Sequence, residues 1–198
     1  MRKINKKEPD FYKELIKSNK PEKWNDIQNK TDIRIYMLSE EQNFQCAYTE
    51  QRIELETSHT DHYIKQSFIL QGLFRPITIF SWENLFTSCN NEFYGAKYKD
   101  KHIKTSDYEL LINPSYENSD NHFIYSWFGE IIIDESNTKG YNTVKLFNLN
   151  DSVLVEQRMV VAFQVKTMHN QFSLVELITI IGKFESMICY LYNQLKDI

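Results

Sequence analysis

Hydrophobic residues recur at helical spacing most clearly in the C-terminal third of the chain. Residues 153–168 carry one such stripe, and Asp151 and Ser152 supply a helix start just before it. Glu156, Arg158 and Lys166 are expected on the outer, polar side of this helix. The pattern therefore predicts a long amphipathic helix.

A second apolar stripe follows and predicts the final helix. It starts at Ser173, where Glu176 three residues later completes a capping box. The stripe comprises Leu174, Leu177, Ile178, Ile181, Phe184, Ile188, Leu191 and Leu195. Such a stripe is most often a core face, but it also suits a dimer surface or one that docks on a partner subunit.

The first 43 residues predict three short helices. Residues 10–17 have helical spacing, a second run begins at Pro21, and Thr31 or Asp32 can cap a third helix. We expect this region to pack around a site rather than form it. Its lysines are typical of a solvated face, with phosphate contact as the alternative.

Strand-like patterns are confined to the middle of the chain. Residues 51–70 have a strand-like pattern, and residues 123–133 alternate and predict a strand pair. The sequence thus predicts an α+β protein that forms a single compact unit with three parts. These are an N-terminal helical region, 1–43, a core, 44–105, and a strand segment with long C-terminal helices, 106–198, that pack on the core.

Charge and cysteine content limit the function classes. A net charge of -4 does not suit a protein that holds nucleic acid by its overall field, so any DNA contact must be local or shared with a partner. The three cysteines are far apart and odd in number, which favours a reducing compartment over a disulfide framework. With no signal-peptide pattern and no apolar run that could span a membrane, we expect a cytoplasmic protein.

Asp61 and His62 are the strongest candidates for chemistry. A neutral imidazole can take a proton from water as the water attacks a phosphate, and a neighbouring carboxylate can hold Mg²⁺ or Mn²⁺. Such a dipeptide is more often structural, so its context has to carry the argument. Asn84 adds to that context, because it can brace the loop and orient His62 by accepting from its second ring nitrogen. A turn or cap role is the alternative for Asn84.

The lysines and cysteines after this pair leave further alternatives open. Lys97, Lys99 and Lys101 are expected either to contact phosphate from a short helix behind the site or to form a solvated turn. Cys46 and Cys89 each lack the nearby second cysteine of a zinc clasp. No structural zinc is therefore expected, and all three cysteines are predicted to be buried thiols.

Several segments together resemble the HNH endonucleases found with retrons and in the Septu anti-phage system, where the nuclease accompanies an ATPase subunit. In order, they are Cys46-Ala47-Tyr48, Asp61-His62-Tyr63, Trp82-Glu83-Asn84-Leu85-Phe86-Thr87-Ser88-Cys89, Leu110-Leu111-Ile112-Asn113-Pro114, His122-Phe123, Gly129-Glu130-Ile131-Ile132 and Val144-Lys145-Leu146-Phe147-Asn148-Leu149-Asn150. With the first four residues, the resemblance spans nearly the whole chain.

The resemblance implies a ββα-metal fold, also called HNH or His-Me finger. It places His62 on the general base, Asp61 on the adjacent metal ligand and Asn84 on the middle asparagine. The third position of the motif departs from the family, because Tyr94-Gly95-Ala96 occupies that region. Asn91 is taken as the substitute metal ligand, with His102 as the other nearby candidate.

The departures at the zinc positions look like a coherent variant. In this interpretation, packing by Tyr94 and Tyr98 holds together the part of the fold that zinc holds together in the family.

Three functional hypotheses follow. The first is a metal-dependent DNA endonuclease that acts as the effector of an anti-phage defence pair with an ATPase. The second is a catalytically degenerate subunit of the same fold that binds an ATPase or nucleic acid without cutting. An RNA-cleaving toxin is the third, since the same chemistry cuts either backbone. The second gains if no substitute for the third ligand lies within reach of Asp61.

Overall fold

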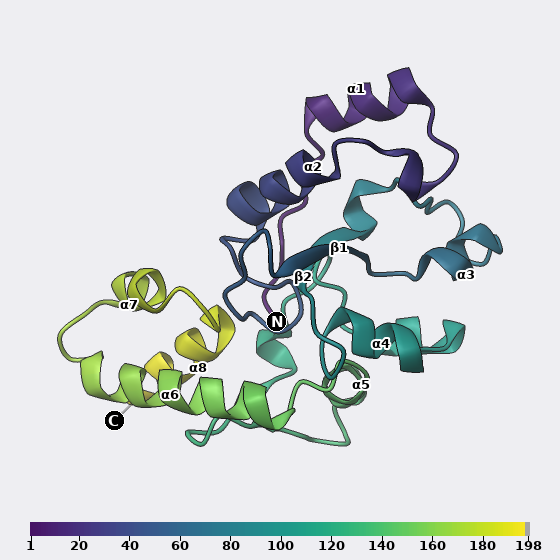
Figure 1. The fold of residues 1–198 in the computed structure, drawn as a ribbon. Helices are drawn as coiled ribbons and strands as arrows, with labels where there is room; N and C mark the ends of the chain where they lie inside the picture. Colours follow the sequence, from purple (N-terminus) through teal and green to yellow (C-terminus); the bar gives the residue numbers. More distant parts are fainter. Residues whose placement is uncertain (197–198) are drawn as a thin grey trace.

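A pair of antiparallel strands lies at the centre of the protein (Figure 1). The structure is a computed structural model and describes residues 1–196. Strand β1, Ser58–His62, pairs with β2, Leu85–Cys89, so that Ser58 lies opposite Cys89 and His62 opposite Leu85. Helix α4, Ala96–His102, follows β2. The α+β prediction is confirmed, and the order strand, strand, helix is the framework that positions the candidate site.

The N-terminal helices cover one side of this pair. They are α1, Asp10–Asn19, the 3₁₀ turn η1, Trp24–Asp26, helix α2, Lys30–Tyr36, and a π turn η2, Met37–Glu41. The run after Pro21 is therefore a single turn and not a helix. Just after η2, the Gln42 side chain donates to Thr87 O and accepts from Thr87 N, both at 2.8 Å. Together with Ala47 N, which donates to Thr87 O at 3.1 Å, this amide pairs the backbone of Thr87 at the free edge of β2, all five residues of which are buried.

The link between the strands carries helix α3, Gln66–Leu70, and a 3₁₀ turn η3, Trp82–Asn84. Of the strand-like residues 51–70, only β1 is a strand in a sheet. The reason is that β2 offers partners to five residues of this segment, and an extended backbone without partners is not stable.

The C-terminal part begins with 3₁₀ turns and a small strand pair. Turns η4, Thr105–Leu110, and η5, Ser119–Asn121, precede β3, Ile124–Tyr125, and β4, Ile131–Ile132. The two strands pair antiparallel, which confirms the strand pair expected over 123–133.

Four helices complete the chain: α5, Thr138–Leu146, α6, Ser152–Met168, α7, Leu174–Ile181, and α8, Glu185–Lys196. The predicted helix over 153–168 and the capping box of Ser173 and Glu176 are both present. The expected single final helix is instead two, because Gly182 and Phe184 adopt positive φ angles of 64° and 55°. Positive φ ends a right-handed helix.

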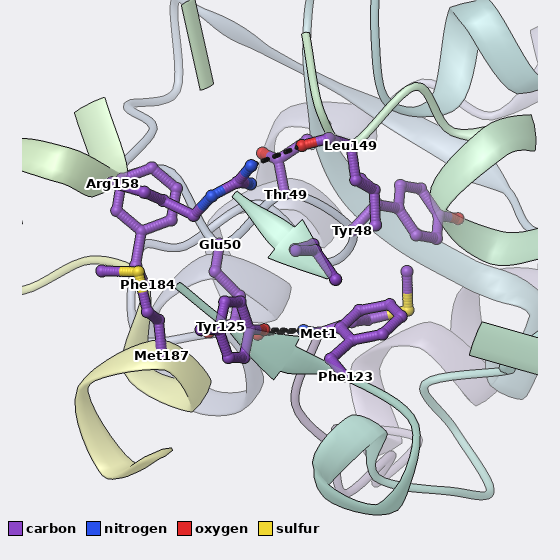
Figure 2. A pocket seen from close by; sticks show the side chains of 11 residues that line it. Met1, Tyr48, Thr49, Glu50, Phe123, Tyr125, Leu149, Arg158, Phe184 and Met187 are labelled. Atoms are coloured by element: carbon purple, nitrogen blue, oxygen red, sulfur yellow. Dashed lines mark hydrogen bonds and ion pairs between the residues drawn. The ribbon is translucent and has the colours of Figure 1, made fainter. Parts of the chain in front are cut away.

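Buried polar groups join the core to these helices (Figure 2). The Met1 amine forms a 2.5 Å ion pair with Glu50, whose carboxylate also accepts from Ser186 N and Oγ at 2.8 and 2.7 Å. Arg158 donates to Gly129 O at 2.6 Å and to Leu149 O at 2.7 Å. Arg158 is thus buried, contrary to the expectation that it faces outward, because these carbonyls satisfy its guanidinium. The cavity between these residues, about 10 Å³, has room for about one water molecule.

Within residues 1–196, no helix combines the length and apolar character needed to cross a bilayer.

Candidate functional site

Asp61 and His62 stand at the end of β1, directly opposite Phe86 and Leu85 of β2. Asn84 lies in η3 just before β2. All three side chains are buried, with exposed fractions of 5%, 4% and 2%. The structure therefore gathers the predicted catalytic residues at one end of the strand pair, but inside the protein.

The atom facing Asp61 is the Nζ of Lys99, which reaches in from α4. It donates to Tyr63 O at 2.7 Å, to His62 O at 3.1 Å and to Asp61 Oδ2 at 3.4 Å. It also forms a 3.1 Å ion pair with Asp100 Oδ1. An ammonium group thus sits among hard oxygen atoms of the kind that bind divalent cations.

Lys99 is fully buried yet remains charged. Burial on its own would lower the pKa of its amine, but the carboxylates of Asp61 and Asp100 outweigh this and hold that pKa above its ordinary value. Asp61 is secured from the other side by the Tyr48 hydroxyl, which donates to Oδ2 at 2.5 Å. The Asp61 carboxylate is therefore engaged by two internal donors.

The charges around Asp61 disfavour a divalent ion. Tyr48 and Lys99 both donate to Oδ2, and an ion bound by this carboxylate would lie close to the Lys99 ammonium, so the two positive charges would repel each other. Across residues 1–196 no three His, Cys, Asp or Glu side chains are grouped in a way that could hold a metal.

The imidazole of His62 has both ring nitrogens engaged. Nε2 lies 2.8 Å from Ile79 O, a pure acceptor, so Nε2 carries the proton and Nδ1 carries the lone pair. The Gln66 amide covers Nδ1 at 3.2 Å, and the ring packs edge-on against Trp24 with centroids 4.9 Å apart. Burial lowers the pKa of His62 below its ordinary value, so the ring is neutral near pH 7. The tautomer suits a base, but its lone pair does not face water.

Asn84 braces the loop after β1 and does not orient His62. Its Oδ1 accepts from Ile64 N at 2.8 Å and its Nδ2 donates to Ile64 O at 3.2 Å. The expected contact with the second ring nitrogen of His62 is wrong, because that nitrogen is bonded to Gln66 instead. The bracing role predicted for Asn84 is present.

Neither proposed substitute for the third ligand is brought to Asp61. Asn91 comes two residues after Cys89, which pairs with Ser58, and Ser58 lies three residues along β1 from Asp61, a distance of about 10 Å. The Oδ1 of Asn91 accepts from the backbone N of its own turn, at Phe93. His102 is exposed at the end of α4, with Nδ1 bonded to Tyr98 O at 2.8 Å.

The three lysines expected to contact phosphate are engaged within the protein. Lys99 is completely buried, so the expectation that it binds nucleic acid is wrong. Lys97 and Lys101 each lie 2.7 Å from the Glu92 carboxylate, and these two contacts lower the pKa of Glu92 to about 2. The Glu92 carboxylate therefore weakens the positive electrostatic potential that these two lysines could offer to a phosphate.

Cys46 and Cys89 come together beside the strand pair. Cys89 N donates to Cys46 Sγ at 3.4 Å, and Ser88 Oγ lies 3.5 Å from the same sulfur. Burial would raise the pKa of Cys46, but hydrogen bonds from Cys89, Ser88 and Thr49 outweigh it and lower that pKa below its ordinary value. Both thiols are buried, as predicted, whereas Cys189 is only partly so.

Only one of the two tyrosines expected to pack here does so. Tyr94 is buried and accepts from Gln51 Nε2 at 3.3 Å. Tyr98 instead lies against the His102 ring, with centroids 4.2 Å apart. Gly95 adopts a φ of 75°, and a Cβ at this position would lie 3.3 Å from Cys89 Sγ. A side chain there would therefore press on the thiol cluster.

Sequence reasoning missed the roles of Lys99, Tyr48 and Gln66. A signal for Lys99 existed, because Ala96, Lys99 and Ile103 fall at helical spacing and are all buried. A lysine on the apolar face of a short helix indicates a buried ion pair. Tyr48 and Gln66 carried no such signal.

No protein-family model matches the chain, and no curated protein sequence matches it. The family resemblance therefore rests on the residues themselves. Four cavities found in the described chain are lined by other residues, not by Asp61, His62 or Lys99.

Proposed function

We propose that this chain is a non-catalytic subunit built on an HNH-type nuclease fold, one that binds a partner and does not cut nucleic acid. The observation that carries the proposal is the Lys99 ammonium among oxygens of Asp61, His62 and Tyr63. In this proposal Lys99 replaces the divalent ion with a covalently attached cation. The ends of both strands and α4 then stay together with no metal.

The partner follows from the resemblance. HNH proteins of retron and Septu systems accompany an ATPase, and we propose an ATPase subunit as the partner of this chain. Two observations support binding over hydrolysis: the candidate base is covered by Gln66, and the nearby lysines are paired with Glu92. DNA or RNA contact is then secondary to the protein partner.

A metal-dependent endonuclease is the second candidate, and one observation favours it. The bond from His62 Nε2 to Ile79 O leaves the lone pair on Nδ1, the tautomer a general base needs. Cutting would require Gln66 to uncover this nitrogen and Lys99 to leave Asp61. Binding of the partner is the event that would have to drive both movements.

Plasmid and RNA cleavage assays separate the two candidates. Wild type and His62→Ala are each incubated with Mg²⁺ or Mn²⁺, with and without an ATPase of the kind that accompanies retron and Septu nucleases. We expect no cleavage above the blank in any combination, while the wild type and His62→Ala both still co-purify with the ATPase. Cleavage that falls about a hundredfold to ten-thousandfold in His62→Ala would establish the endonuclease instead.

A further inference from the structure

Helix α6 has apolar residues on both faces. Its inner face packs into the core through Leu154, Val161 and Val165, each fully buried. Its outer face exposes Phe163 by 68%, Val160 by 55% and Met159 by 45%. A single exposed apolar residue is ordinary, but three within one and a half turns of one helix make a patch.

Opposite charges flank this patch. Glu156 precedes it, Lys166 follows it, and both side chains are exposed. Neither forms an ion pair with any residue in 1–196. At about 100° per residue, these two residues lie on the same side of the helix as Met159 and Phe163. Along the helix, the outer face therefore carries an acidic residue, then the apolar patch, then a basic residue.

We propose that this face binds a second copy of the chain, with the two α6 helices antiparallel. Residues 156 and 166 share the midpoint 161, and so do residues 159 and 163. An antiparallel pair centred on residue 161 therefore places Glu156 of each copy beside Lys166 of the other. The same register places Met159 of each copy against Phe163 of the other.

This self-complementarity is the reason for choosing a second copy as the occupant. A two-fold interface presents the same patch twice, so charges must balance about its centre. The outer face of α6 meets this condition for both its charged and its apolar residues. A different partner would impose no such symmetry on this helix. The inference does not depend on the proposed function.

The mass of the wild-type protein in solution, measured by light scattering or sedimentation, tests the proposal with charge variants. The expected wild-type species has twice the 23.7 kDa chain mass. Phe163→Glu should be a monomer. Glu156→Lys and Lys166→Glu should each weaken the dimer roughly tenfold, since each affects two exposed pairs per dimer. The double variant Glu156→Lys/Lys166→Glu should recover wild-type dimerisation, because the charges are only exchanged.

Cysteine cross-linking tests the register independently. Val160→Cys lies next to the two-fold axis and should form a disulfide between copies under oxidised glutathione. Val153→Cys is the matched control, because its two copies would be on the order of 24 Å apart along the helices. Wild type controls for the native cysteines, and all substituted positions are exposed, so circular dichroism should show unchanged folding.

Three outcomes would overturn the proposal. The wild type could remain a monomer at every concentration, or the dimer could survive Phe163→Glu. Preferential cross-linking through Val153→Cys would refute the antiparallel register. If the wild type is a monomer and Phe163→Glu loses the ATPase, the patch belongs to that partner and not to a second copy.

Discussion

The end of β1 and the outer face of α6 differ in the kind of side chain that each one buries or exposes. At the end of β1, charged and polar groups that could do chemistry are buried and bonded to one another. On α6, apolar side chains that would suit a core are exposed and have no partner in the described chain. The comparison shows that residue type does not identify a binding surface. What matters is whether the interacting atoms are still available.

The largest predicted effect is on the buried ion pair. Lys99→Met leaves the Asp61 carboxylate buried without its cation, which should reduce the free energy of unfolding by about 3–5 kcal/mol. Urea unfolding measures it. The double variant Lys99→Met/Asp61→Asn should recover part of the loss, because Asp61 then carries no buried charge, while Asp100 and the carbonyls of His62 and Tyr63 still lack Lys99. Lys101→Met, on the exposed side of α4, is the control and should change stability by less than about 0.5 kcal/mol. A similar small loss for Lys99→Met would contradict the buried pair.

The second-largest expected effect is the loss of stability in Asn84→Ala. Asn84→Ala leaves the N–H and C=O of Ile64 unpaired in the interior, and we expect a loss of about 2–3 kcal/mol in urea unfolding. Asn91→Ala is the matched control, since it removes one bond in a turn nearer the surface and should cost less than about 1 kcal/mol. If the two variants were equally stable, Asn84 would not brace the loop.

The pH dependence of stability tests whether the two histidines of β1 are buried. Burial lowers the pKa of both His59 and His62, so between the lowered value and the ordinary 6.5 only the unfolded chain binds the extra proton. The histidines' contribution is fully present above pH 6.5 and is lost as the pH falls through the lowered values. Urea midpoints from pH 8 to 5 should therefore decline below about pH 6.5. The decline should be shallower in His62→Gln, and an equally steep decline there would rule out His62 as a source.

The smallest predicted effect concerns the surface lysines. Because Glu92 already pairs with Lys97 and Lys101, replacing both with Ala should leave DNA binding by the isolated protein weak and almost unchanged. Fluorescence anisotropy with labelled duplex at low salt measures it. Tight, salt-sensitive binding by the wild type that this double variant abolishes would show that these lysines do contact phosphate.

The comparison also shows what the sequence can and cannot predict. Periodicity predicted α6 and the strand pair near residue 130, and capping residues predicted the start of α7, because these signals are local. The partners of Asp61 come from residues 48 and 99, and the bonds of His62 come from residues 66 and 79. Such contacts depend on the tertiary fold, so local patterns do not contain them. The dipeptide Asp61-His62 was found from sequence, but its burial was not.

The proposed function requires that Lys99 occupy the cation position beside Asp61. Titration with Mn²⁺, followed by the electron paramagnetic resonance signal of the free ion, tests it on the wild type and on Asp61→Asn. We expect the two proteins to titrate alike, with no stoichiometric site. One Mn²⁺ bound per wild-type chain and lost in Asp61→Asn would contradict it.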